Sequence, residues 1–238
     1  MKRLKNVFTI FVAVVFLLIG LYSLVYPFNE YKDLKANDET IKNIIVSDAE
    51  EGGNGEKEIA IDWEKLLGIN ENVIAWIYIP DTNVSYPVLQ VKNNSEVIRK
   101  DLYGNYSKCG CLFVEATTQE PFNTGNTIIY GHNLNNGLMF SQLRYYSSES
   151  YMKKHSYVYV FFPDGKIKKY KVFSFEKVNA NDKSIYDSGV LTETDLQNYY
   201  KNLNKSNEYV KESRIITLST CTNNEKNTRY VVHAKEVE

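Results

Sequence analysis

An apolar run near the amino terminus limits what this chain can be more than any other feature does. It covers the 22 residues VFTIFVAVVFLLIGLYSLVYPF, from Val7 to Phe28, and follows a basic tip that contains Lys2, Arg3 and Lys5. As a helix the run would be about 33 Å long at ~1.5 Å per residue, which matches the ~30 Å hydrocarbon core of a bilayer. We therefore expect residues 1–28 to be held in a membrane, so that only the rest folds in water.

A cleaved signal peptide is the alternative interpretation of this run. Signal peptides have an apolar region of only ~7–15 residues and end in a small-x-small cleavage site. Here the run is longer, and Tyr22, Tyr26 and Phe28 lie where interfacial aromatic residues are expected. The pattern favours an uncleaved single-pass anchor in the cell membrane. Because positive charges stay on the cytoplasmic side, the amino terminus is expected inside and the following domain outside.

Composition excludes several other classes of protein. The 238 residues carry a formal net charge of −1, and a nucleic-acid-binding domain usually has a clustered basic surplus. We therefore expect no nucleic-acid partner. Three cysteines are too few for a disulfide framework. Cys109 and Cys111 have no second ligand pair for zinc, so we expect neither a metal nor another cofactor, and both are predicted to be structural or surface thiols.

Residues 29–60 are densely charged and contain Gly52, Gly53 and Gly55, which is typical of a stalk or linker. From residue 61 the pattern changes to short β-like runs with helical patches between them. The predicted strands are 74–79, 84–90, 111–115, 127–130, 157–162, 166–175, 215–220 and 229–235, and the predicted helices are 94–102, 138–146 and 193–203. The chain is thus predicted to be mostly β, with residues 61–238 forming one eight-stranded β-barrel with peripheral helices.

Cys221 is a candidate nucleophile because it ends a predicted strand and is followed at once by a polar loop. A thiol at such a place is both held and accessible, and it becomes nucleophilic if a base or a cation is near. The alternative is a buried structural cysteine, which is the commoner case. This residue alone does not decide between the two.

His132 and Arg229 are candidate partners of such a thiol. His132 ends the strand 127–130 through Gly131, which we expect to turn the backbone sharply. Arg229 begins the last strand, eight residues after Cys221, so a tight loop would bring both to one end of the barrel, where a guanidinium could donate to an oxyanion. Of the other histidines, His155 is interpreted as part of a surface basic patch. His233 is interpreted as packing between strands, although it shares a strand face with Arg229.

The sequence Thr217-Leu218-Ser219-Thr220-Cys221, followed by Arg229 and preceded by Tyr130-Gly131-His132-Asn133, resembles the sortase family over roughly residues 60–238. Sortases are extracellular cysteine transpeptidases of Gram-positive bacteria. The resemblance implies an eight-stranded β-barrel, an amino-terminal signal anchor and a Cys221–His132–Arg229 site. The helix-bearing connection before the cysteine strand is most similar to class B, and a sortase of another class is the alternative.

The resemblance also implies a set of substrate-binding residues. Asn94 and Ile98 match one wall of the class B peptide groove, and Asn181, Ile185 and Tyr186 match the other, with the aromatic side chain open to a shift of one position. Ser219 and Thr220 flank the nucleophile, and backbone amides near them are candidate oxyanion donors.

By resemblance, the substrate is a secreted protein with a carboxy-terminal sorting signal, which is cleaved after Thr through a thioester on Cys221. The acyl group then passes to an amine of peptidoglycan or of its lipid-linked precursor, and this anchors the protein to the cell wall. Two alternatives from other classes stay open at this point. One is an extracellular cysteine hydrolase without transfer, and the other is a catalytically silent binding domain.

Overall fold

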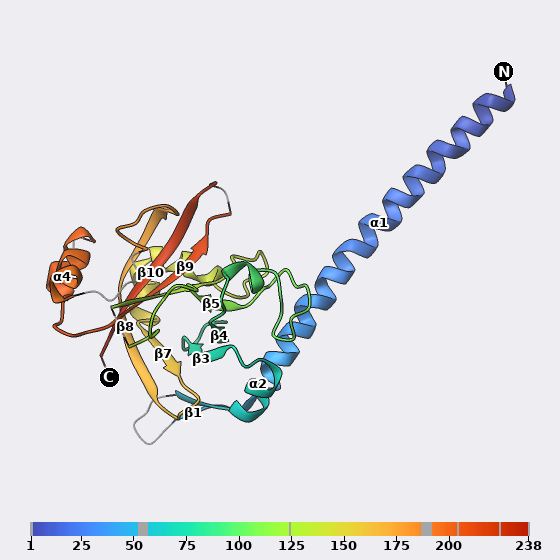
Figure 1. Cartoon of the computed structure of the whole chain (residues 1–238). Coiled ribbons are helices and arrows are strands. Elements are labelled where there is room, and N and C mark those ends of the chain that lie inside the picture. Colours follow the sequence, from blue (N-terminus) through green and yellow to red (C-terminus); the bar gives the residue numbers. More distant parts are fainter. Residues whose placement is uncertain are drawn as a thin grey trace. The chain divides into compact units, whose positions relative to one another are not determined.

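A computed structural model describes residues 2–51, 57–123, 125–186, 192–203, 205–223 and 225–237. The chain divides into two compact units, residues 1–42 and 43–238. The first unit is one continuous helix, α1 (Lys2–Lys42) (Figure 1). Its segment Asn6–Ser23 is long and apolar enough to cross a membrane, as judged by length and composition only.

The segment 29–60, expected to be a stalk, contains a helix and two strands in most of its described part. α1 continues to Lys42, and β1 (Ile45–Glu51) then pairs with β2 (Lys57–Ile61) as a two-stranded antiparallel sheet. Helix α2 (Trp63–Ile69) follows, and Asp62 caps it by accepting a hydrogen bond from the backbone N–H of Lys65 at 3.0 Å. Regular structure thus leads up to the first strand of the barrel.

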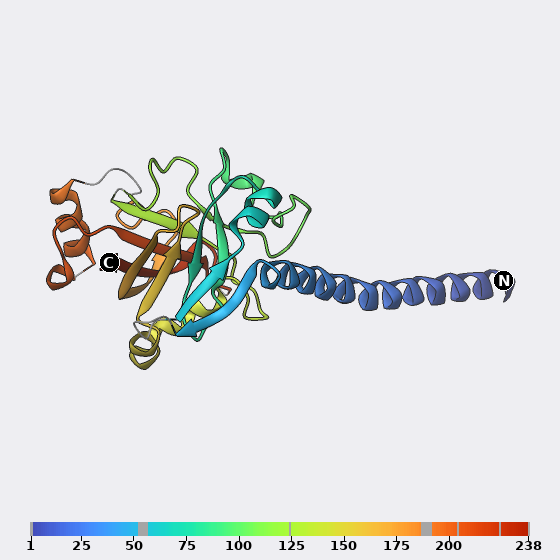
Figure 2. The ribbon, with the colours of Figure 1, turned by 90° about the horizontal axis from the view of Figure 1, so that it is seen from below.

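Eight further strands form one closed barrel, as predicted, and the sheet wraps around a common interior (Figures 1 and 2). The strands are β3 (Val73–Tyr78), β4 (Ser85–Leu89), β5 (Leu112–Val114), β6 (Asn126–Tyr130), β7 (Tyr157–Phe161), β8 (Ile167–Asn179), β9 (Ile215–Cys221) and β10 (Thr228–Glu236). Their order around the barrel is β10-β8-β7-β3-β4-β5-β6-β9. Neighbours are antiparallel except for two parallel pairs, β4 with β5 and β6 with β9.

The helices between the strands differ in part from the predictions. The 3₁₀ turns are η1 (Asn94–Glu96), η2 (Ser141–Ser147) and η3 (Ser206–Glu208), and the α-helices are α3 (Glu149–Lys154) and α4 (Glu193–Asn202). The helix predicted over 94–102 is reduced to the single turn η1, because the Asn93 side chain accepts from the backbone of Ser95 and the Asp101 side chain accepts from that of Tyr103. Such local bonds compete with helix formation.

α4 covers one face of the three neighbouring strands β8, β10 and β9. It begins with a capping box between Thr192 and Asp195, and its predicted apolar stripe is buried. Leu196, Tyr199, Tyr200 and Leu203 pack with Phe173, Ile185, Ile215 and Val231 in one cluster. Strand β9 therefore has apolar neighbours on both faces, and all of its residues are buried except Cys221.

A buried polar network lies beside this cluster. The Nδ1 atom of His233 is 3.0 Å from the hydroxyl of Tyr199 and 3.1 Å from that of Thr217. The Thr217 hydroxyl also donates to Asn126 at 2.7 Å. The network thus joins α4 to β6, β9 and β10. His233 is buried in this network, in contact with both α4 and β9.

Candidate active site

Cys221, His132 and Arg229 fall into one row across three neighbouring strands. β9 lies between β6 and β10, and Cys221 is paired directly with Arg229 on antiparallel β10. On the other side, the parallel pairing with β6 runs from Asn126 opposite Ile215 to Tyr130 opposite Ser219. The same register, continued by two residues, places His132 opposite Cys221. Partners on adjacent strands are ~4.8 Å apart and face the same side of the sheet.

The ladder continues past Tyr130, which supports this register. The backbone N–H of Gly131 donates to the carbonyl of Ser219 at 3.1 Å, and the Thr220 hydroxyl donates to the carbonyl of Gly131 at 2.7 Å. His132 thus leaves β6 while the chain is still held against β9.

The accessibility of Cys221 follows from the cover over β9. Every second residue of β9 points to the face that α4 covers, namely Ile215, Thr217, Ser219 and Cys221. Ile215 lies in the α4 cluster, Thr217 in the polar network, and Ser219 has its Oγ atom 2.9 Å from the hydroxyl of Tyr186. The cover ends there, and Cys221 is exposed. The thiol is therefore held by a buried strand and open to solvent at its end.

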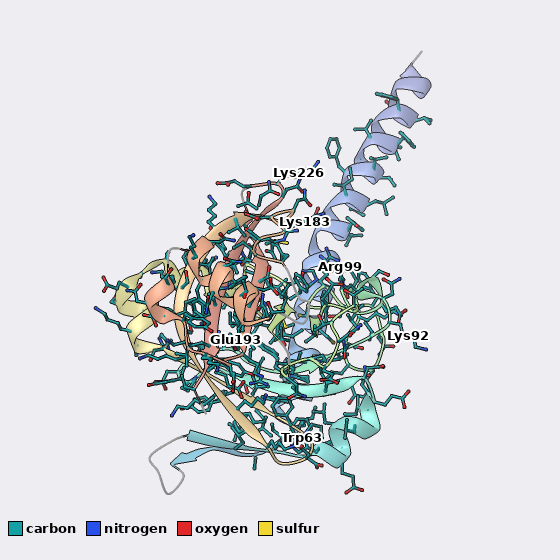
Figure 3. The ribbon with its side chains drawn as sticks, turned by 60° about the vertical axis from the view of Figure 1, so that its left-hand side comes forward. Trp63, Lys92, Arg99, Lys183, Glu193 and Lys226 are labelled. Atoms are coloured by element: carbon teal, nitrogen blue, oxygen red, sulfur yellow. The ribbon has the colours of Figure 1, made fainter. Side chains whose placement is uncertain are left out.

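The imidazole of His132 is half-buried and oriented by a backbone carbonyl. Its Nε2 atom is 2.6 Å from the carbonyl oxygen of Ile98. Because a carbonyl oxygen only accepts, Nε2 carries the hydrogen, and Nδ1 is left to exchange a proton with other groups. Burial lowers the pKa of His132, the bond to Ile98 opposes this effect, and the positive charge of Arg99 lowers the pKa further. Arg99 is exposed on the loop after η1 (Figure 3).

Two glycines allow the close packing around His132. Gly110 has a φ of +59°, and a Cβ atom there would lie 2.4 Å from the Ile98 oxygen and 3.1 Å from Cδ2 of His132. Gly131 was expected to provide a sharp turn, but its φ is not positive. A Cβ at Gly131 would instead lie 2.3 Å from Leu112 and 2.7 Å from Phe140, so it is close packing that requires glycine there.

A cavity of about 290 Å³ lies over this row. It is lined by the three candidate catalytic residues and by most of the predicted substrate-binding residues, namely Asn94, Ile98, Tyr186, Ser219 and Thr220. Two predicted binding residues do not line it. Ile185 is buried in the cluster under α4, and Asn181 is exposed outside the cavity. In that stretch the residues that do line the cavity are Ala180 and Tyr186.

The aromatic wall of the cavity was missed in the sequence. Tyr130 stacks on Tyr186 with ring centroids 6.2 Å apart, and Phe113 packs against Tyr130 at 5.4 Å. Burial raises the pKa of Tyr130, and a hydrogen bond to the Glu115 carboxylate raises it further. The same carboxylate accepts from Nδ2 of Asn94 at 2.7 Å. The parity of β6 was the available signal, because Tyr130 shares a strand face with His132.

The remaining histidine and cysteines lie away from this row. His155 is buried, with Nδ1 3.0 Å from the carbonyl of Pro80 and its ring on Tyr151. The prediction of a surface basic patch was wrong because α3 folds this residue inward. Cys109 and Cys111 are buried, and burial raises the pKa of Cys111 to about 12. In the described ranges no group of three His, Cys, Asp or Glu side chains could hold a metal ion.

Comparison with known proteins agrees with this geometry. A sequence profile of the sortase domain matches residues 77–237, which is more than half of the chain. The chain belongs to the sortase family. A curated relative, sortase B of Staphylococcus aureus, is 28% identical over 100% of this chain and 98% of its own length. Sortase B of Listeria monocytogenes is 29% identical over 69% of this chain and 68% of its own length.

Solved structures give the same result. Clostridium perfringens sortase B matches with a TM-score of 0.67 and 28% identity, over 74% of this chain and 99% of that one. A substrate complex of S. aureus sortase B matches with a TM-score of 0.67 and 28% identity, over 74% and 85% of the two chains. This sortase is therefore of class B, a cysteine transpeptidase of the kind that anchors surface proteins.

Proposed function

We propose that this sortase cleaves a carboxy-terminal sorting signal after Thr and transfers the acyl group to an amine of peptidoglycan or of its lipid-linked precursor. The observation that carries the proposal is the row of His132, Cys221 and Arg229 on β6, β9 and β10, under one cavity. A nucleophile, a proton carrier and a fixed cation are then neighbours. This is the set that acyl transfer through a thioester requires.

In the first half-reaction the thiolate of Cys221 attacks the Thr carbonyl carbon. Negative charge develops on the carbonyl oxygen, and the guanidinium of Arg229 stabilises it. His132 protonates the leaving amine from Nδ1 while Nε2 stays bound to the Ile98 carbonyl. The C–N bond breaks, and the acyl group is left as a thioester on Cys221.

In the second half-reaction the acceptor amine attacks this thioester. Its proton passes to Nδ1 of His132, the C–S bond breaks, and the thiolate of Cys221 is restored. Two easier steps thus replace one difficult step. Among the similar solved structures, one is a substrate complex of S. aureus sortase B and another is a sortase B complexed with triglycine. These complexes support a peptide donor and a glycine-type amine acceptor for the present enzyme.

We further propose that residues 1–28 anchor the enzyme with its amino terminus in the cytoplasm, and that the barrel works outside the cell. The apolar segment Asn6–Ser23 and the basic residues before it support this topology. Confinement to the membrane surface raises the effective concentration of enzyme and emerging substrate toward each other.

Product analysis tests the proposal. Full-length enzyme in detergent is incubated with a library of peptides containing Thr-Gly or Thr-Asn, with and without triglycine. We expect cleavage after Thr, and we expect triglycine to divert the product from free acid to amide. Cys221→Ala and His132→Ala should abolish cleavage. Arg229→Ala should cost ~10²–10³ in rate, as losing one oxyanion donor typically does. Cleavage that yields only free acid would instead indicate a hydrolase.

Arg229→Lys separates geometry from charge. An ammonium group keeps the positive charge but not the planar fork of donors. We expect this variant to stay well below wild type in kcat. Recovery to the wild-type kcat would show that charge alone is sufficient at this position.

A further inference from the structure

Side-chain hydrogen bonds continue the contact between β6 and β9 beyond the ends of the strands. The Nδ2 atom of Asn133 donates to the carbonyl oxygen of Cys221 at 2.9 Å. One step further out, Nδ2 of Asn223 donates to Oδ1 of Asn135 at 3.1 Å. The two loops that leave the row are thus tied together where backbone pairing has stopped.

Asn133 has a special place between these loops. It directly follows His132 in the chain, and its side chain binds the backbone of Cys221. The backbone on its own side is also held, because the N–H of Phe140 donates to the carbonyl of His132 at 3.0 Å and residues 133 and 139 form an isolated antiparallel bridge. The Asn133 amide thus links the backbone of Cys221 directly to the residue that follows His132.

The oxygen atom of the Asn133 side-chain amide indicates that this residue does not serve stability alone. Its Oδ1 atom is buried and has no hydrogen-bond partner within the described part of the chain. A buried acceptor without a partner destabilises the fold. An apolar side chain would pack here without this cost. A side chain that only held the loop would have both of its polar atoms hydrogen-bonded.

We propose that Asn133 is a positioning residue for the transpeptidase reaction, whose side-chain amide fixes the backbone of Cys221 at the height of the His132 imidazole. This inference rests on the roles proposed above for Cys221 and His132. Near-attack geometry tolerates little error, because a misplacement of ~1 Å can cost ~10² in rate. The hydrogen bond from Asn133 should affect the rate of turnover rather than substrate binding, since Asn133 is not among the residues that line the cavity.

The test compares Asn133→Ala with Asn135→Ala in the full-length enzyme. Asn135 is the matched control, because it lies on the same loop and bonds across the same gap but is exposed and accepts its hydrogen bond from Asn223. The substrate is a quenched peptide that wild type cleaves. We expect Asn133→Ala to lose ~10- to 100-fold in kcat with KM within about twofold, at a temperature where both variants are folded. Asn135→Ala should keep the wild-type kcat.

Asn133→Asp gives a second readout that a merely structural residue would not produce. Its carboxylate has the same shape but cannot donate to the Cys221 carbonyl, whereas the protonated acid can. The ratio of its kcat to that of wild type should therefore rise as the pH falls from about 7.5 to about 5.5, toward the range in which carboxyl groups bind protons. The same ratio for Asn133→Ala should stay flat. A flat ratio for both variants would contradict the proposal.

A third readout does not depend on the peptide. Cys221 is alkylated with iodoacetamide at pH 7, with Cys221→Ala as the blank and His132→Ala as the reference for a thiol without its imidazole. We expect alkylation of Asn133→Ala to be slowed toward the rate of His132→Ala. If kcat and alkylation in Asn133→Ala both equal wild type, Asn133 is not a positioning residue, although the proposed function stands. If wild type cleaves no peptide, the proposed function fails, and alkylation alone then decides the role of Asn133.

Discussion

Burial and the charge of Arg99 act in the same direction on the imidazole of His132. Both lower its pKa and disfavour the imidazolium form, and only the bond from Nε2 to Ile98 opposes them. The imidazolium form is therefore disfavoured in the resting protein, so in the proposed mechanism His132 takes its proton from the Cys221 thiol, which becomes the attacking thiolate, and then passes it to the leaving amine.

Replacing Arg99 tests the electrostatic part of this balance. Arg99→Ala removes a positive charge near the imidazole, so the pKa of His132 should rise. Because Arg99 is exposed, the rise should be small at low salt and smaller still at high salt. Arg99→Lys keeps the charge and should keep the pKa. NMR titration of the His132 ring gives the value, and a pKa that falls in Arg99→Ala would contradict this account.

Gly110 offers a steric test at the same scale. Gly110→Ala would place a Cβ atom 2.4 Å from the Ile98 oxygen, so this carbonyl must move and His132 loses its acceptor. We expect kcat to fall by ~10- to 100-fold. Gly104→Ala is the matched control, because Gly104 also has a positive φ, +81°, but nothing within 4 Å of its would-be Cβ.

Both glycine variants should lose ~1 kcal/mol of stability through their backbone conformation, and Gly110→Ala should lose more because the Ile98 carbonyl must also move. Only Gly110→Ala should also lose activity. Steady-state kinetics and thermal unfolding of the two variants separate these effects, and equal losses of kcat would refute the role of the Ile98 carbonyl.

At the scale of single elements, strand β9 shows what patterns in a sequence can and cannot reveal. The eight barrel strands were predictable because each contains a run rich in β-branched and aromatic residues. α4 was predictable from its cap and its 3.6-residue period. The pairing of β6 with β9 was not, because residues far apart in sequence carry no local signal of their register.

The same limit applied to the site. Cys221, His132 and Arg229 could be selected from their motif, and Arg229 could be placed from its short loop. The positions of Asn181 and Ile185 depend on how the connection after β8 packs under α4. No hydrophobic periodicity in that stretch indicates this packing. His155 was misplaced for a similar reason, because its burial results from a contact with the distant Pro80.

The polar network under α4 predicts an acid-sensitive fold. Burial lowers the pKa of His233 to about 3, whereas an unfolded chain has a histidine pKa near ~6.5. Between these values the unfolded state binds more protons than the folded state. The contribution of the neutral His233 to the free energy of unfolding is therefore complete above pH ~6.5. It is lost as the pH falls, by up to ~1.4 kcal/mol per pH unit.

His233→Gln should remove this dependence. Urea unfolding of the full-length protein in detergent, at intervals from pH ~7 to pH ~4.5, gives the free energy of unfolding across the range where the unfolded histidine takes up its proton. We expect the variant to be less stable at neutral pH, because the network is broken, but to have a flatter curve toward acid. Curves that run parallel for both proteins would show that His233 does not titrate on unfolding.

At the scale of the whole molecule, the two units should be separable. The unit that begins at Asn43 contains the complete barrel and the cluster under α4, and a compact unit with its own core is able to fold alone. A chain starting at Asn43 should be soluble and should keep the wild-type kcat on a short peptide.

The full chain should instead stay with the membrane fraction after an alkaline wash. External protease should cut it beyond residue 29 in cells stripped of wall. Recovery from the cells of a mature form that begins near residue 28 would overturn the anchor and favour a signal peptide.

The order of strands around the barrel has a consequence for how the enzyme is made. Among the eight barrel strands β10 is synthesised last, yet it lies between β8 and β9 and closes the ring. It also carries Arg229, and β9 just before it carries Cys221. Because synthesis runs from the amino terminus, His132 is present in the growing chain long before Cys221 and Arg229. The row of His132, Cys221 and Arg229 is therefore complete only when the last strand has joined the ring.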